Sequence, residues 1–105
     1  MIVRPLLASV PLFAILALSQ PVAAADASNG EVLAKRWCAA CHIVAADQQS
    51  GNTQASPFSA IARNPNFDAA QLALFLMVPH PVMPSMTLSR SEAADLAAYI
   101  KTQGK

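Results

Sequence analysis

The sequence predicts a small all-α protein built from three to five short helices. Two observations favour this fold class. Apolar residues recur at the three- and four-residue spacing of buried helix faces, and residues that cap helices precede these runs. No segment shows the alternation typical of a strand, and no internal repeat or linker divides the chain. We therefore expect a single helical domain.

Residues 1–25 have the three parts of an export signal. Arg4 supplies a positive charge, the apolar run 5–18 follows, and small residues in an A-x-A pattern end the segment. The apolar run has 14 residues, including two prolines, whereas about 20 apolar residues are needed to cross a bilayer. This favours a cleaved signal peptide over a retained membrane anchor, which is the alternative.

Cleavage is expected after Ala25, with cleavage after Ala24 as the second choice. The product is a domain over 26–105, exported to the periplasm and not stably inserted in a membrane. Its 80 residues include six basic and six acidic side chains, and no basic patch with interleaved aromatic residues. Nucleic acid is therefore excluded as a partner. A chain this short buries little apolar surface and usually needs an additional stabilising element.

The run WCAACH, residues 37–42, contains both cysteines of the chain, Cys38 and Cys41, followed at once by His42. A disulfide would close a very small loop and constrain the unfolded chain little. A thiol redox pair normally begins a helix within a βαβ unit, but this run ends a helical pattern. A zinc site needs four ligands, and His80 is the one other good candidate. Covalent haem attachment is the interpretation that remains.

In this interpretation Cys38 and Cys41 bind one haem c through thioether bonds, and His42 is the proximal ligand of its iron. The two-residue spacing lets one helical turn present both sulfurs to the same edge of the porphyrin. A large, flat, mostly apolar cofactor also gives a short chain something to fold around. The predicted fold is therefore a set of short helices wrapped around one covalently bound haem.

The first helix is expected to run from Ser28 into Cys38, with Ser28 and Glu31 as a capping box. Small and polar residues over 43–55 predict a loop along one edge of the haem. Pro57 is expected to start a short helix over 58–62.

A third helix is predicted after Asp68, which caps it together with Gln71. Its apolar face consists of Leu72, Phe75 and Leu76, and it ends before Pro79. Ser89 and Glu92 form the capping box of the last helix. The buried stripe of that helix is predicted to contain Ala93, Leu96, Ala97 and Ile100, with Tyr99 beside it.

The stiff, proline-rich segment 79–84 contains Met83, which is the preferred second axial ligand. Its flanking prolines lower the entropy lost when this loop is held against the haem. A thioether is a soft ligand that favours ferrous iron and raises the reduction potential. Met86, His80 or an open iron are the alternatives, whereas Met77 falls within a helical pattern and is expected in the core.

These features resemble the class I, monohaem cytochromes c of the bacterial periplasm, over essentially all of 26–105. The resemblance rests on Gly30 eight residues before Cys38, CAACH, SPF at 56–58, PVMP at 81–84, and LSRSEAADLAAYI at 88–100. It implies that the first and last helices cross near Gly30, Leu96 and Tyr99. It also implies that the carbonyl of Pro57 accepts a hydrogen bond from Nδ1 of His42. One departure is Ala34, where the family often has a larger residue; Leu33 or Trp37 would fill that volume.

The expected function is single-electron transfer by Fe(III)/Fe(II) cycling with His/Met ligation, in an exported, soluble monomer. No catalytic residue is predicted, and the partners are redox proteins: a dehydrogenase as donor, and an oxidase or reductase as acceptor. The alternatives are a dedicated haem subunit of such a complex, an enzyme or gas sensor with an open iron, and a haem-free thiol oxidoreductase. The scattered cations predict docking through an apolar rim; strong ionic-strength dependence of the electron-transfer rate would contradict this.

Overall fold

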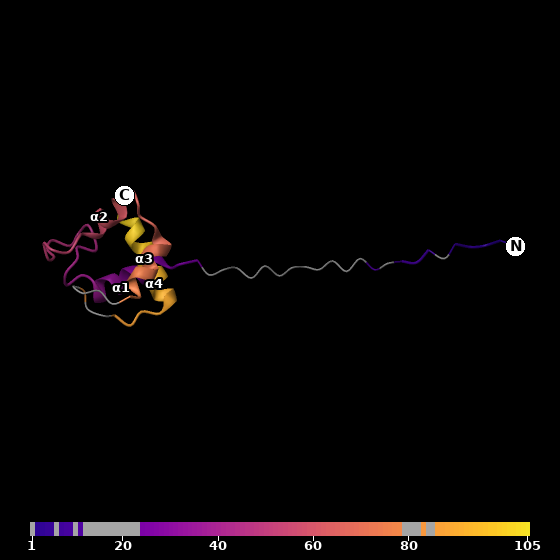
Figure 1. Ribbon diagram of the computed structural model, residues 1–105, viewed down its shortest axis with the longest axis horizontal. Coiled ribbons are helices and arrows are strands. Elements are labelled where there is room, and N and C mark those ends of the chain that lie inside the picture. Colours follow the sequence, from indigo (N-terminus) through magenta and orange to yellow (C-terminus); the bar gives the residue numbers. More distant parts are fainter. Residues whose placement is uncertain (1, 6, 10, 12–23, 79–82, 84–85) are drawn as a thin grey trace.

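The computed structural model describes residues 2–5, 7–9, 11, 24–78, 83 and 86–105. The helices within these ranges are α1 (Ala27–Trp37), α2 (Phe58–Arg63), α3 (Ala69–Leu76) and α4 (Arg90–Thr102). No strand occurs among these residues, so the predicted all-α fold is confirmed. The described residues near the N-terminus are exposed and lie outside the helical body (Figure 1).

Helix α4 is the centre of the fold, because α1, α2 and α3 all pack against it. Its buried residues include the predicted stripe, namely Ala93, Leu96, Ala97, Tyr99 and Ile100. The predicted capping box is also confirmed: the amide of Glu92 donates to Oγ of Ser89 at 3.1 Å, and the amide of Ser89 donates to Oε1 of Glu92 at 2.9 Å. Local capping and a continuous apolar stripe thus position the helix on which the other three depend.

Helix α1 begins earlier than predicted, because Asp26 and not Ser28 is its N-cap. The Asp26 carboxylate accepts hydrogen bonds from the amides of Ser28 and Asn29, at 2.9 and 3.1 Å. Glu31 does not complete a box with Ser28; its carboxylate pairs with Lys35 one turn further on, at 2.8 Å. The extended backbone of Asp26 lets the first helical turn form two residues earlier.

The predicted crossing of α1 and α4 is confirmed at Gly30, which is buried. A Cβ atom at this position would lie 2.6 Å from the carbonyl carbon of Asp95 and 2.7 Å from Cβ of Tyr99. The two helix backbones therefore approach each other closely, and only a residue without a side chain fits between them.

Ala34 is fully buried one turn beyond the crossing, and Leu33 joins the core beside it. Trp37 remains 44% exposed, with the guanidinium of Arg36 4.8 Å from its ring centroid. Of the two residues expected to fill the volume near Ala34, Leu33 is thus the one that packs inside.

Helix α3 is capped as predicted, since Asp68 accepts a hydrogen bond from the amide of Gln71 at 3.0 Å. Of the predicted apolar face, Leu76 is buried and Leu72 half-buried, whereas Phe75 is 55% exposed. Successive helical residues are about 100° apart, and the face directed at α4 includes Leu72 and Leu76 but not Phe75.

Apart from Met83, residues 79–82 and 84–85 of the segment between α3 and α4 lie outside the described ranges, and so does the alternative ligand His80. Across the part of the chain that the structure describes, we find no helix with the length and apolar character that a membrane span requires.

Candidate cofactor-binding site

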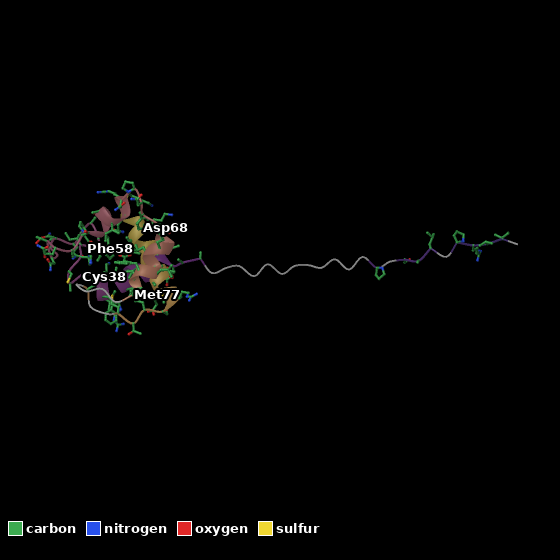
Figure 2. The ribbon with its side chains drawn as sticks, in the orientation of Figure 1. Cys38, Phe58, Asp68 and Met77 are labelled. Carbon is green, nitrogen blue, oxygen red and sulfur yellow. The ribbon has the colours of Figure 1, made fainter. Side chains whose placement is uncertain are left out.

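A tight turn at the end of α1 positions the two cysteines and the histidine. The amides of Cys38 and Ala39 both donate to the carbonyl of Ala34, at 2.9 and 3.0 Å. The amides of Cys41 and His42 then both donate to the carbonyl of Cys38, at 3.1 and 2.8 Å. These bonds hold Cys38, Cys41 and His42 within one turn, as the spacing predicted. The position of Cys38 is labelled in Figure 2.

Both thiols are free, with Cys38 buried and Cys41 exposed. Burial raises the pKa of the Cys38 thiol to about 11, so this thiol is protonated at neutral pH. A catalytic thiol pair requires a thiol with a lowered pKa, which is the opposite environment. In addition, no three histidine, cysteine, aspartate or glutamate residues of the described chain gather as a metal-ion site would require.

The His42 ring is oriented by the backbone of a distant loop. Its Nδ1 atom lies 2.5 Å from the carbonyl oxygen of Ser56. Because a carbonyl can only accept, Nδ1 bears the proton and donates it, and Nε2 of the neutral ring keeps a lone pair. This is the tautomer that a metal-ligating histidine needs, and the second-shell bond increases the basicity of Nε2.

The expectation that the Pro57 carbonyl accepts this bond is wrong by one residue. The carbonyl of Pro57 accepts instead from the amides of Ala60 and Ile61, at 3.0 and 3.1 Å, as α2 begins. Since the N-cap carbonyl is used by the helix, the preceding carbonyl of Ser56 is the one available to His42. The proline still contributes as the predicted start of α2.

Two aromatic residues connect the His42 ring to α4. The ring of Phe58 lies 5.6 Å from that of His42 and 6.4 Å, edge to face, from that of Tyr99. The hydroxyl of Tyr99 donates to the carbonyl of Val44 at 2.7 Å, and burial raises its pKa. The histidine is therefore braced against the central helix by buried, well-packed side chains.

Gln48 is a positioning residue that the sequence analysis missed, since it assigned this region only to a polar loop. Its side-chain oxygen accepts from the amide of Val44 at 2.9 Å. Its side-chain nitrogen lies 2.8 Å from the carbonyl of His42, 3.1 Å from that of Ala39 and 3.0 Å from that of Ser50. A single side chain thus ties the loop to the cysteine–histidine turn.

Two backbone bonds complete this support. The amide of Asn52 donates to the carbonyl of Cys41 at 2.7 Å, and the amide of Phe58 donates to that of Ile43 at 2.9 Å. The turn is consequently held from the loop side as well as from α1, which fixes the directions of its side chains before any cofactor binds.

Gln48→Met is expected to destabilise the protein by about 1–3 kcal/mol, because methionine matches the shape of glutamine but leaves the carbonyls of the turn without their donor. Urea denaturation of the haem-loaded protein measures this. Gln49→Met is the matched control, since Gln49 is exposed. Equal denaturation midpoints for the two variants would contradict the positioning role.

Among the candidate axial ligands, Met83 is half-buried in a bend between α3 and α4. Met86 packs against the hydrophobic core. Met77, which was expected in the core, is the C-cap of α3 and is 39% exposed, so that expectation is wrong.

Two comparisons with known proteins agree with each other. The family profile described as cytochrome c matches residues 27–104. Cytochrome c-552 of Bradyrhizobium diazoefficiens is 51% identical to this chain over 87 residues, which are 83% of this chain and 84% of that relative. No solved structure matches significantly.

Proposed function

The chain belongs to the cytochrome c family, whose members carry electrons on covalently bound haem c, and we propose that Cys38 and Cys41 attach this haem while His42 and Met83 ligate its iron. Family membership identifies the protein as a haem electron carrier and not an enzyme. The single observation that supports the site residues best is the hydrogen bond from Nδ1 of His42 to the Ser56 carbonyl, one turn from two free thiols.

The residues present fit a haem group. Two unpaired thiols and an imidazole with its Nε2 lone pair available occupy one turn, which is the donor set that haem c requires. Large apolar side chains are also exposed at the end of α3, namely Leu74, Phe75, Met77 and Val78. A flat apolar cofactor would cover such surface. When bound, the haem supplies one-electron exchange between ferric and ferrous iron.

The proposed residues have distinct tasks around that group. His42 donates its Nε2 lone pair, and the Ser56 carbonyl fixes the ring and increases its donor strength. Met83 contributes a soft thioether that favours the ferrous state. The packing of Met86 against the hydrophobic core supports Met83 as the ligand, because Met86 already has a structural role.

The protein is proposed to act in the periplasm as a monomer after removal of residues 1–25, with a dehydrogenase as donor and an oxidase or reductase as acceptor. Two of the six basic side chains of 26–105 form polar contacts within this chain, which supports docking through an apolar rim. Lys35 pairs with Glu31, and Arg63 donates to the backbone carbonyl of Lys105 at 3.2 Å.

Absorption spectra of the exported protein, oxidised and reduced, test this function. We expect a low-spin, six-coordinate haem with the long-wavelength band of a methionine–iron bond in the oxidised state. The pigment is expected to stay with the protein in acid acetone, because thioether bonds survive that treatment. Pigment that washes away would contradict covalent attachment, and a high-spin spectrum with carbon monoxide binding would contradict His/Met ligation.

A further inference from the structure

A buried carboxylate on α4 binds the very first turn of α1. Asp95 is only 9% exposed. One of its oxygens accepts from the backbone nitrogen of Asp26 at 2.7 Å, and the other accepts from Nδ2 of Asn29 at 2.9 Å. The contact joins residues almost seventy positions apart in the sequence and lies one turn from the close approach at Gly30.

This carboxylate lacks a cationic partner among the described side chains. The ion pair found within the described ranges joins Lys35 and Glu31, and no described lysine, arginine or histidine lies within 4.0 Å of Asp95. A buried carboxylate without a cation is costly, because its lost hydration is repaid only by neutral donors. One of the atoms it already contacts, the Asp26 nitrogen, would become positively charged if the chain began there.

We propose that the export signal is removed between Ala25 and Asp26, and that the Asp26 ammonium so released forms an ion pair with the Asp95 carboxylate. The inference rests on the proposed export of the protein. A signal peptidase adds one water across the Ala25–Asp26 peptide bond. The oxygen of that water joins the carbonyl carbon of Ala25, which leaves as a carboxylate, and the Asp26 nitrogen becomes an ammonium. Nothing is oxidised or reduced.

The geometry separates the two cleavage positions that the sequence leaves open. Cleavage after Ala24 would leave the Asp26 nitrogen as a neutral amide and move the positive charge one residue away, a Cα spacing of about 3.8 Å. Cleavage after Ala25 places the charge on the atom that Asp95 contacts. An ammonium at a helix N-terminus is opposed by the helix dipole, so this position is favourable only because a carboxylate faces it.

The other titratable groups at α1 and α4 around this contact are nearly balanced in charge, with three carboxylates and four cations. They are the Asp26 side chain, Glu31, Lys35 and Arg36 on α1, and Arg90, Glu92, Tyr99 and Lys101 on α4. Glu92 interacts with both Asp95 and Arg36. Helix α2 contributes Arg63, which donates to the carbonyl of Lys105, and α3 contributes no charged side chain. An ammonium at Asp26 would pair with the Asp95 carboxylate and would also offset the repulsion between that carboxylate and Glu92.

The test begins with the mass of the exported, haem-loaded protein, which is expected to start at Asp26. Haem-loaded chains that start at Asp26, or with one alanine before it, are then compared with and without Asp95→Asn. The added alanine keeps the hydrogen bond but removes the charge from it. It is expected to raise the unfolding equilibrium constant about tenfold at pH 7, since charge-assisted bonds are about twice as strong as neutral ones. In the Asp95→Asn background, the added alanine should leave the stability of the protein unchanged or raise it slightly.

The effect should also depend on pH in a defined direction. An unfolded α-amine has a pKa of roughly 7.7–8.0, and a facing carboxylate raises that value in the folded state. The stabilisation is therefore complete below about pH 7.5 and is lost as pH rises through the folded pKa of the amine. Titration of the Asp26 amine by NMR in the unaltered protein measures this without any variant, even if Asp95→Asn fails to fold.

Three results would overturn the proposal: an N-terminus at Ala25 or elsewhere, equal effects of the added alanine with Asp95 and with asparagine, or an unshifted pKa of the amine. An intact leader on the exported protein would overturn the processing and the export together. The haem spectrum is expected to be identical in all four proteins, so electron-carrier function is judged separately from this contact.

Discussion

Gly30→Ala is expected to destabilise the haem-loaded protein by about 2–3 kcal/mol, although alanine in a helix is intrinsically favourable by about 1 kcal/mol. The new Cβ would lie 2.6 Å from the carbonyl carbon of Asp95 and 2.7 Å from Cβ of Tyr99. Neither atom can rotate away, because one is backbone and the other is fixed to it. The helices α1 and α4 must therefore move apart to admit one methyl group.

The consequence extends to the site, because Cys38 is the C-cap of α1 and α4 contains the Tyr99 that braces the histidine. Urea denaturation followed by circular dichroism measures the loss. Val32→Ala is the matched control: it introduces alanine on the same helix at a side chain that is 63% exposed, and is expected to change stability by less than about 0.5 kcal/mol. A Gly30→Ala protein as stable as this control would show that the crossing is looser than described.

The helices were predictable where their signals are local. The Ser89–Glu92 box and the Asp68 cap each use residues within one turn, and both are found as expected. At the start of α1, Asp26 and Ser28 lie two residues apart and both are of a type that caps helices; the choice of Asp26 over Ser28 is linked to a contact with Asp95 in another helix. A sequence pattern within one segment cannot predict a contact with a residue in a distant helix.

The same distinction applies to the cofactor site. Cys38, Cys41 and His42 lie within five consecutive residues, so their grouping follows from the sequence alone. The supports of that turn come from a loop whose path the sequence does not define. Gln48 is one of several polar residues there, and its partners depend on where the loop returns. The choice of the Ser56 carbonyl depends likewise on how α2 begins.

These supports have one physical effect in common. The carbonyls of Cys38, Ala39, Cys41, His42, Ile43 and Val44 each accept a hydrogen bond from a described donor. A turn whose carbonyls are already satisfied loses little entropy when its side chains bind a cofactor. The loop therefore contributes to haem binding without contacting iron, and the Gln48→Met variant separates this contribution from ligation.

Met83→Ala is expected to leave the haem covalently bound but to abolish low-spin His/Met ligation. Attachment is proposed to depend on Cys38 and Cys41, which this change does not touch, whereas the sixth ligand would be lost. The long-wavelength band of the oxidised protein should disappear. The reduction potential should fall by on the order of 100 mV, a fraction of the roughly 0.8 V over which axial ligands tune haem iron. Spectra and redox titration of the purified variant measure both effects.

Met86→Ala is the matched control, because it removes the same side chain three residues away. Met86 packs against the core, so its loss is expected to cost about 2 kcal/mol of stability while the methionine–iron band and the potential are preserved. The reverse pattern, with the band lost in Met86→Ala and kept in Met83→Ala, would assign the ligand to Met86. A low-spin haem that lacks the band in the unaltered protein and stays low-spin in both variants would exclude both methionines and point to His80. Ligation and packing are thus separated, since one changes the iron's spectrum and the other the unfolding equilibrium.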